Sequence, residues 1–433
     1  MKTYLSYPCF ALLLTIATFL NSEANDNWPN WRGPSNQGRI SQTDLPLSWG
    51  KNKNLIWKFN LPDRGNSTPV VWENKIFLTQ AIEKKNQRNL ICLDLQSGKQ
   101  LWTDGVAYDK PEATHRTNPY CSASAVVNDS KVIALFGSAG LVCWDHNGKK
   151  LWDYKPGDQT YEWGNGSSPI IWNDICIFYF GPGPEARMIA LDINNGKELW
   201  TWIEPSHRPE KRTDGFRGNR NGMACTYSSP VIMELAGQDS VVMLFPGFMR
   251  GFNPESGKLQ WESPGLNPLV YSSPVSIGNT VVGMGGYSGT TIASEINKFS
   301  SQPIKPNWTD VRTKNRLGSA VISSPTLGFV LNTPGFFEAF NPKNGESYFQ
   351  ERLPAEGPSR ESWSSLVLAG DKVFCFNQSG DTVIVRASKE FEVLGINSIG
   401  NELTNSSPVV VRDRLLLRTH KSLWCFGNKQ KNL

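Results

Sequence analysis

The chain has 433 residues, a net charge of +5 at pH 7 and lysines and arginines that are scattered without forming a basic run. Scattered charge argues against nucleic-acid binding, which needs positive charge gathered on one surface, and four histidines without paired spacing argue against a zinc site. Beyond the N-terminus no stretch approaches the roughly 20 apolar residues that span a bilayer. We therefore expect a protein with no nucleic-acid partner, no metal site and no membrane span.

Residues 1–24 are expected to be a secretory signal peptide. Lys2 is followed by an apolar run over residues 10–20 and by small residues at positions 22 and 24, which is the pattern of a cleaved signal. Two alternatives remain open, a buried first helix and a lipid anchor on Cys9, although this cysteine precedes the apolar run. We expect a periplasmic or extracellular mature protein over residues 25–433, and we expect it to be a monomer.

A step resembling Ser-Ser-Pro-Val recurs eight times in the mature chain, at intervals of roughly 40 to 60 residues, the length of one propeller blade. Proline at the head of a strand is typical of an edge strand, because the missing N–H is tolerated there. The copies at 123 and 364 lack the proline. The eight copies begin at Ser67, Ala123, Ser167, Ser228, Ser272, Ser323, Ser364 and Ser406.

A second pattern follows the first and predicts a hairpin. In residues 93–102 an apolar strand ends in Asp94, Gly98 supplies the positive φ of the turn, and Leu101-Trp102 opens a new strand. Further copies lie at 144–152, 191–200 and 252–261, with a degraded copy at 340–349. The tryptophans at 57, 102, 152, 200 and 261 are expected to pack between neighbouring blades, where each ring can bury on the order of 200 Å².

The two patterns and a third apolar run between them give four short strands per unit, without helical periodicity. We expect an all-β, eight-bladed propeller with four-stranded antiparallel blades. The last unit lacks an outer strand, and residues 52–60 hold an unassigned strand, so the N-terminal strand should complete the last blade and close the ring. The blades are expected near 66–102, 120–152, 165–200, 226–261, 270–308, 321–349, 361–394 and 404–427.

Seven cysteines follow the signal segment, and no two are adjacent. An odd number in an exported protein leaves at least one free thiol or an intermolecular bridge. Cys92, Cys143 and Cys425 lie in apolar strand-like runs, where cysteine acts as a small buried hydrophobic residue. We favour buried free thiols over a disulfide framework.

The repeats resemble the PQQ-like propeller repeat of quinoprotein dehydrogenases and of BamB-like outer-membrane assembly factors, over residues 27–427. The opening Trp-Pro-Asn-Trp-Arg-Gly-Pro at 28–34, and the segments 136–142, 284–289 and 418–425, resemble exported quinoprotein-like propellers abundant in planctomycete-type bacteria. This resemblance implies an eight-bladed ring outside the cytoplasm. It does not by itself imply a bound quinone.

The resemblance allows the oxidoreductase hypothesis to be compared with the residues of this chain. Quinoprotein dehydrogenases hold PQQ against a calcium-type ion with Glu, Asn and Asp ligands, and the alcohol-oxidising branch adds a disulfide between adjacent cysteines. This chain has no adjacent cysteines and no clustered carboxylates to supply the six to eight oxygens that calcium takes. We expect no cofactor, with PQQ and Ca²⁺ as the alternative. The chain is also expected to depart from the BamB-like pattern, because a lipid anchor is not expected here.

A ligand site is expected on the long connections between blades, because these rise together around the mouth of the channel. The connections are expected at 103–120, 153–165, 201–227, 309–321 and 350–363. Arginines among aromatics would suit an anionic, planar or carbohydrate-like ligand; the alternative is solvated charge or ion pairs that hold the loops. The candidates are His115, Arg116, Glu162, Trp163, Arg217, Arg220, Arg316, Arg360, Glu361 and Trp363.

Among these candidates, the pairs at 162–163 and 361–363 are the preferred positions for a pocket, since each stands just before an inner strand. No arrangement of nucleophile, base and acid stands out in the sequence. We expect a non-catalytic binding or scaffold propeller that takes a protein or polysaccharide partner through the loop-rich face. The alternative is a PQQ-dependent oxidoreductase acting on an alcohol or sugar.

Overall fold

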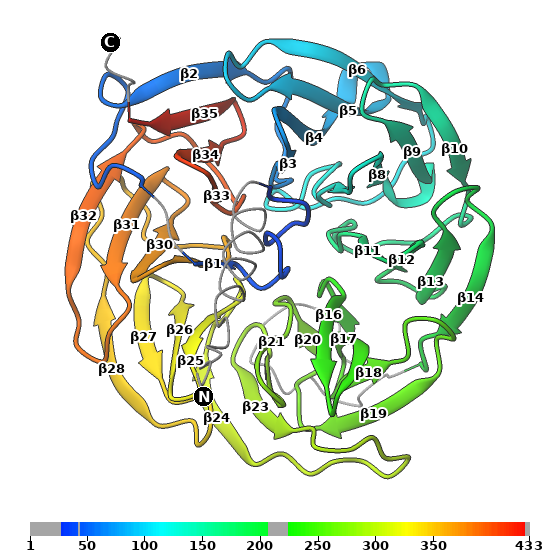
Figure 1. The fold of residues 1–433 in the computed structure, drawn as a ribbon, viewed down its shortest axis with the longest axis vertical. Coiled ribbons are helices and arrows are strands. Elements are labelled where there is room, and N and C mark those ends of the chain that lie inside the picture. The colour runs from blue at the N-terminus through cyan, green and yellow to red at the C-terminus, as the bar shows by residue number, and fades with distance from the viewer. Residues whose placement is uncertain (1–26, 42–43, 207–223, 429–433) are drawn as a thin grey trace, which may run out of the picture.

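The structure is a computed structural model that describes residues 27–41, 44–206 and 224–428. The predicted signal peptide lies outside these ranges. Eight four-stranded antiparallel blades surround one axis, with the first strand of each blade innermost (Figure 1). The predicted eight-bladed propeller is confirmed. In the described residues the only helical segments are two single 3₁₀ turns, η2 (Glu83–Lys85) and η3 (Gly137–Ala139).

The strands of the first four blades follow one another in chain order. The first blade holds β3 (Val70–Trp72), β4 (Lys75–Ile82), β5 (Gln87–Asp94) and β6 (Gln100–Ala107). The second holds β7 (Val126–Val127), β8 (Lys131–Leu135), β9 (Leu141–Asp145) and β10 (Lys150–Tyr154). The third holds β11 (Ile170–Trp172), β12 (Ile175–Phe180), β13 (Arg187–Asp192) and β14 (Glu198–Ile203). The fourth holds β16 (Val231–Leu235), β17 (Gln238–Phe245), β18 (Phe248–Phe252) and β19 (Leu259–Pro264).

The remaining blades repeat this order until the ring closes. The fifth holds β21 (Val275–Ile277), β22 (Thr280–Met284), β23 (Gly289–Glu295) and β24 (Trp308–Lys314). The sixth holds β25 (Val321–Ser324), β26 (Leu327–Asn332), β27 (Phe336–Phe340) and β28 (Ser347–Arg352). The seventh holds β29 (Val367–Ala369), β30 (Lys372–Phe376), β31 (Asp381–Arg386) and β32 (Val393–Ser398). The eighth holds β33 (Val409–Val411), β34 (Arg414–Arg418), β35 (Ser422–Gly427) and β2 (Leu55–Asn60).

The ring closes as expected, because strand β2 from the N-terminal part supplies the outer strand of the eighth blade. It pairs antiparallel with β35, with Leu55 opposite Phe426 and Asn60 opposite Ser422. Two short parallel pairs lie outside the blades proper. One joins β15 (Cys225–Thr226) to β20 (Leu269–Val270), and the other joins β1 (Arg39–Ile40) to β29.

The fifth blade differs from its expected range of 270–308. This blade lacks the glycine turn between its third and fourth strands, and residues 296–307 form a long connection there. Part of the connection lies against the fourth blade, where the Ile304 N–H donates to the carbonyl of Glu262 over 2.8 Å. The outer strand β24 therefore begins at Trp308 and occupies residues that were expected to form a loop from 309 onwards.

The repeated glycine and tryptophan join one blade to the next. Nε1 of Trp102 on the first blade donates to the carbonyl of His146, in the last turn of the second blade, over 3.1 Å. Gly148 in that turn has φ +87°, and a methyl group added to it would lie 2.7 Å from the Trp102 ring. Glycine is thus required both by the turn and by the docked ring. The same contact recurs for Trp57, Trp152, Trp200 and Trp308.

The fifth predicted tryptophan, Trp261, also packs between blades. It is fully buried in one cluster with Val281 and Ile292 of the fifth blade. The seven cysteines in the described ranges are all buried, and no disulfide joins any two of them, as expected. Burial raises the pKa of the thiol of Cys92 to about 12, so this thiol is protonated and behaves as an apolar group.

A closed ring of hydroxyl hydrogen bonds links the eight blades around the axis. In each link the hydroxyl oxygen of one blade accepts from the backbone N–H of the preceding blade, over 2.8 to 3.1 Å. Because every blade gives one hydroxyl and one N–H, no member of the ring is left unsatisfied. The hydroxyl ring consists of Thr68, Ser124, Ser168, Ser229, Ser273, Ser319, Ser365 and Ser407.

The hydroxyl ring corrects one repeat assignment. In the sixth blade the ring member is Ser319, followed by Ala320 and Val321, and not the expected copy at 323–326. That copy falls across the end of β25 and the turn before β26, where Ser324 opposes Leu327. The proline step is therefore present in five blades and absent from the second, sixth and seventh.

We predict that Ser229→Ala lowers the free energy of unfolding by about 1–3 kcal/mol, because it leaves a buried N–H without an acceptor. The Ser168 N–H donates to Ser229 Oγ over 2.9 Å, and both residues are at most 2 % exposed. The measurement is equilibrium denaturation. The control is Ser130→Ala, at an exposed turn serine, which should change stability little; equal effects of the two substitutions would contradict this role for the ring.

A plug segment, residues 28–40, crosses the axis and was not foreseen from the repeat (Figure 1). Its backbone pairs with β3 at Val71, accepts from the Val127 N–H of β7, and pairs with β29 through β1. Its side chains reach three further blades, through Arg32 to the Ala320 carbonyl, Asn36 to the Pro230 carbonyl, and Gln37 to Ser276. The plug segment therefore bonds to six of the eight blades.

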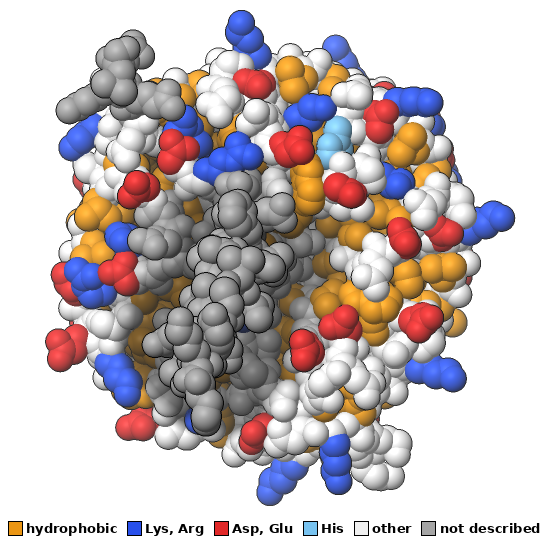
Figure 2. Space-filling model, viewed as in Figure 1, with side chains coloured by type: hydrophobic (Ala, Val, Ile, Leu, Met, Phe, Trp, Pro, Cys, Tyr) orange, Lys and Arg blue, Asp and Glu red, His pale blue; other side chains and the backbone are white. Residues whose placement is uncertain are grey.

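The face that carries the plug segment bears interspersed basic and acidic side chains without a patch of one sign (Figure 2). This distribution agrees with the scattered charge of the sequence. In the described ranges no helix is long and apolar enough to cross a membrane.

Candidate functional site

A pocket of about 200 Å³ occupies the central channel. Eight of its lining residues hold one position in the repeat, two residues before the hydroxyl ring, and each blade supplies one of them. We call these the wall positions. They are Asn66, Ser122, Gly166, Tyr227, Tyr271, Leu317, Trp363 and Asn405.

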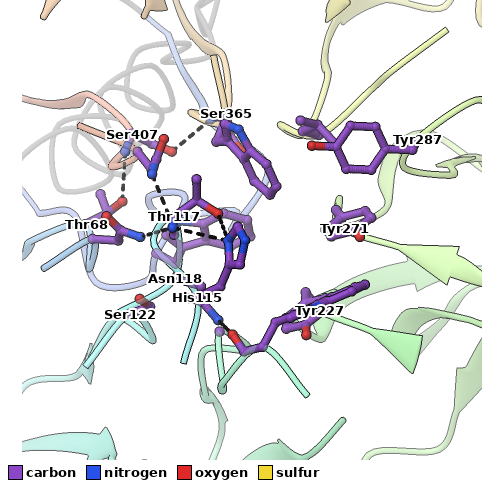
Figure 3. Close-up of a pocket in the computed structure, with 17 residues that line it drawn as sticks. Thr68, His115, Thr117, Asn118, Ser122, Tyr227, Tyr271, Tyr287, Ser365 and Ser407 are labelled. Atoms are coloured by element: carbon purple, nitrogen blue, oxygen red, sulfur yellow. Dashed lines mark hydrogen bonds between the residues drawn. The ribbon is translucent and has the colours of Figure 1, made fainter. Parts of the chain in front are cut away.

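The wall positions divide the pocket into two unlike halves. The fourth to seventh blades supply Tyr227, Tyr271, Leu317 and Trp363, which form a continuous apolar and aromatic half. The other four blades supply only asparagine, serine and glycine. Figure 3 shows the tyrosines on one side of the cavity and the polar residues on the other.

The aromatic half is a connected cluster of rings. Tyr227 and Tyr271 stack with centroids 5.5 Å apart and planes 8° apart. Tyr287, from the turn between β22 and β23, meets Tyr271 edge-on at 5.7 Å, and Trp363 meets both of these tyrosines at 5.8 and 6.1 Å. All four rings are only partly buried, so they present aromatic surface to the cavity.

The polar half is held in place by hydrogen bonds to the tip of the connection after β6. The carbonyl of Thr117 accepts from Nδ2 of Asn66 over 2.7 Å and from Nδ2 of Asn405 over 3.2 Å. Nδ2 of Asn118 donates to the carbonyl of Trp163 over 2.7 Å. The tip is thus bonded to the first, eighth and third blades, which fixes the polar half before any ligand arrives.

Two polar atoms of this tip remain available. Nδ1 of His115 is 2.7 Å from Oγ1 of Thr117, while in the described ranges His115 Nε2 and Asn118 Oδ1 have no hydrogen-bond partner. Burial, and then the charge of Arg116, lower the pKa of His115 below its usual value. The imidazole is therefore neutral at pH 7 and offers one ring nitrogen to a ligand.

The interior of the pocket carries no formal charge among the described residues, since none of those lining it is Asp, Glu, Lys or Arg. Charged groups lie at the rim instead. Burial and then the charge of Glu361 raise the pKa of Tyr287, whereas Arg116 acts in the opposite direction. Among the described residues the pocket therefore has an uncharged lining.

The structure brings three of the predicted site residues into this pocket: His115, Trp163 and Trp363. Arg116, Glu162 and Glu361 follow or precede them in the chain but are not part of the lining. At each preferred pair the tryptophan, not the glutamate, faces the cavity. Arg217 and Arg220 lie outside the described residues.

Two predicted arginines are placed elsewhere. Arg360 is exposed and borders a separate small cavity near Leu331 and Cys375. Arg316 is only 4 % exposed and forms ion pairs with Glu338 at 3.1 Å and Asp310 at 3.4 Å. For Arg316 the ion-pair alternative is the right one, because it joins the fifth and sixth blades.

Of the wall positions, sequence reasoning found Trp363 and missed the other seven, and it also missed Trp31. The signal that could have found the wall positions is the residue directly before each Ser-Ser step, which varies in type while its neighbours repeat. Trp31 belongs to the plug segment, which has no repeated counterpart, and it lines the pocket as well.

A pH-dependent effect on stability is expected from His420, whose Nε2 donates to Oδ1 of Asn66 over 3.1 Å. Burial, with the charges of Arg418 and Arg64, lowers its pKa to about 4. Between about pH 6.5 and 4 the unfolded chain binds a proton at this residue that the folded chain does not. The contribution of His420 therefore lowers the stability as the pH is lowered through that window. We predict that His420→Gln reduces that loss by up to about 2 kcal/mol, measured by denaturation at pH 7, 5.5 and 4. Equal pH slopes would contradict the prediction.

The alternative cofactor, PQQ with Ca²⁺, can be compared with the groups present. Calcium takes six to eight oxygen ligands, chiefly carboxylates and carbonyls. In the described ranges no carboxylate lines the pocket, and no group of three His, Cys, Asp or Glu could hold a metal ion. PQQ is itself a tricarboxylate, and no described lysine or arginine lines the pocket to pair with it. The residues present do not fit this cofactor.

The fold and the pocket together define an eight-bladed propeller with a central site whose described lining is uncharged. Residues 47–217 match the family described as outer membrane protein assembly factor BamB. BamB from Moraxella catarrhalis shares the fold with a TM-score of 0.57 and 13% identity, covering 86% of this chain and 99% of that chain. The family match covers less than half of the chain, which is thus similar in part of its sequence and in its fold to the BamB-like propellers.

Dehydrogenases share the same fold. A europium-containing methanol dehydrogenase gives a TM-score of 0.66 at 12% identity, covering 94% of this chain and 99% of that chain. The quinohemoprotein alcohol dehydrogenase from Comamonas testosteroni gives 0.64 at 13% identity, covering 96% and 83%. At such low identity these likenesses concern the fold alone.

One curated relative matches part of the chain. The tetrathionate hydrolase of Acidithiobacillus ferrooxidans (strain ATCC 23270 / DSM 14882 / CIP 104768 / NCIMB 8455) is 25% identical over 244 residues. The match covers 52% of this chain and 42% of that protein, so the chain spans less than half the length of this relative.

Proposed function

We propose that this chain is a non-catalytic exported propeller that binds a protein or polysaccharide partner through its loop-rich face, in the periplasm or at the cell surface. The central pocket is the point of attachment. The connections after β6, β10 and β28 bring His115, Trp163 and Trp363 to its edge, and binding residues commonly lie on such loops.

The observation that carries this proposal is the division of the wall positions into an aromatic and a polar half without charge. Binding sites combine apolar surface with a few placed polar groups, and this lining has both. General acid–base work needs a group whose pKa lies near the working pH. The one imidazole here has a lowered pKa, and burial holds the pKa of Tyr227 far above its ordinary value.

Two measurements on the mature protein, residues 25–433, test the proposal. The first is titration with PQQ and CaCl₂, followed by absorbance, melting temperature and dye-linked oxidation of ethanol and glucose. We expect no saturable change and no oxidation. Saturable binding with oxidation would replace the proposal by the oxidoreductase alternative.

The second measurement compares the wild type with the double variant Tyr271→Ala, Trp363→Ala on arrays of neutral glycans and of peptides. We expect binding to one of these classes that is lost in the double variant, with circular dichroism and melting temperature showing that the variant folds. Binding that the double variant retains would show that the partner does not use the pocket.

A further inference from the structure

The channel has one mouth, because the plug segment closes its other end. Three layers follow one another along the axis: the wall positions, the hydroxyl ring two residues later, and the plug segment. Nη2 of Arg32 donates to the Ala320 carbonyl over 2.6 Å, and Nδ2 of Asn36 donates to the Pro230 carbonyl over 3.1 Å. Both carbonyls belong to the residue directly after a member of the hydroxyl ring. The plug segment thus lies directly beneath the ring.

The plug segment is closely packed at this end of the channel. Arg32 is 1 % exposed, and a methyl group at Gly38 would clash with the guanidinium of Arg32 and the carbonyl of Leu366. Trp31 of the same segment is partly exposed and lines the pocket. The cavity is therefore a cup with an indole at its base, and a polymer cannot thread through it.

The lining matches the chemistry of a sugar ring. A pyranose has an apolar C–H face and a rim of hydroxyl groups. The face can lie on the rings of Tyr271, Tyr287 and Trp363, while the hydroxyls can reach Nε2 of His115 and Oδ1 of Asn118. An uncharged pocket imposes no desolvated ion on such a ligand, and the bonded tip makes the site ready-formed, which reduces the entropy lost on binding.

We propose that the pocket recognises the terminal ring of a neutral glycan, whose chain leaves through the loop-rich mouth. This inference rests on the proposed binding function and narrows its partner to one class. Because the plug segment closes the cavity at its base, the end of a glycan chain can enter it, whereas an internal stretch of the chain cannot.

The experiment uses isothermal titration of the mature protein with linear oligosaccharides of glucose, mannose, galactose and N-acetylglucosamine. Each is tested with free ends, with a bulky fluorophore on one end, and with both ends blocked. We expect one series to bind, with an affinity that stops rising after the first few rings. Blocking one particular end, or both ends, should abolish binding, whereas the same group on the other end should be tolerated.

Variants locate the site. Trp31→Ala and Trp363→Ala should each weaken binding about tenfold or more, because each removes an aromatic surface worth on the order of 1.4 kcal/mol. Trp172→Ala is the matched control, since Trp172 lies at the end of β11, bonds to Asp239 over 2.8 Å and does not line the pocket. Melting temperatures show whether each variant folds, and Trp363→Ala leaves the plug segment intact.

The outcomes separate this inference from the proposed function. If no free-ended glycan binds but a peptide does, and Trp363→Ala abolishes peptide binding, the binding function stands and the glycan inference is overturned. If doubly blocked glycans bind as tightly as free ones, recognition of the chain end is overturned. If glycans bind equally well to Trp31→Ala and Trp363→Ala, the site lies elsewhere and the inference fails.

Discussion

Replacing Arg316 by alanine is expected to lower the free energy of unfolding by about 3–5 kcal/mol, because it leaves a buried carboxylate without its cation. Glu338 is fully buried, and its Oε2 accepts from Nη2 of Arg316 over 3.1 Å and from Nδ2 of Asn332 over 2.8 Å. Arg316 also donates to Thr291 of the fifth blade. The measurement is equilibrium denaturation at pH 7.

Two further variants serve as a control and as a test of rescue. Arg360→Ala removes an exposed arginine and should change stability by less than about 0.5 kcal/mol. The double variant Arg316→Met, Glu338→Leu removes both charges and should recover most of the loss, because an apolar pair needs no compensation. A loss of ligand binding without a loss of stability in Arg316→Ala would instead place this residue in the site.

Trp57→Ala is expected to cost about 3–5 kcal/mol as well, since it leaves a cavity where the ring closes. Trp57 is 8 % exposed, its Nε1 donates to the carbonyl of Leu95 over 2.9 Å, and it lies on β2. This strand is joined to the eighth blade by non-covalent contacts alone. Denaturation measures the cost, and limited proteolysis should show faster cleavage near residues 55–60.

The control is Trp152→Ala, which removes the same kind of docked ring between the second and third blades, where Nε1 of Trp152 donates to the carbonyl of Ile193 over 2.9 Å. Here the chain itself holds the neighbouring blades together. We expect lower stability but no new cleavage near residues 55–60. Similar proteolysis of the two variants would show that the closure is no weaker than the other junctions.

The period of the two sequence patterns was sufficient to predict the propeller, because each copy carries its own structural reason. The Asp-to-Gly turn ends one strand and starts another, and the tryptophan after it docks on the next blade. The sixth blade shows where pattern alone misleads. Ser323-Ser324-Pro325 matches the repeated sequence pattern, but Ser319 is the residue that occupies the sixth blade's position in the hydroxyl ring.

The site was predictable only in part. Trp163 and Trp363 were found because they stand in long connections just before an inner strand. Tyr227 and Tyr271 were overlooked because they adjoin the most regular part of the repeat, which was taken to be structural throughout. Trp31 could not be inferred, since a segment that crosses the axis makes contacts more than 200 residues away in the chain, such as that of Arg32 with Ala320.

The wall positions separate the task of building the ring from the task of choosing what enters it. Their neighbours two residues on carry the hydroxyl-ring bonds between blades, while the wall side chains take no part in the hydroxyl ring. Substitution of single wall residues, blade by blade, can therefore change the ligand preference of the pocket without changing the propeller that carries it. Homologous propellers with the same hydroxyl ring but different residues at the eight wall positions should bind different ligands.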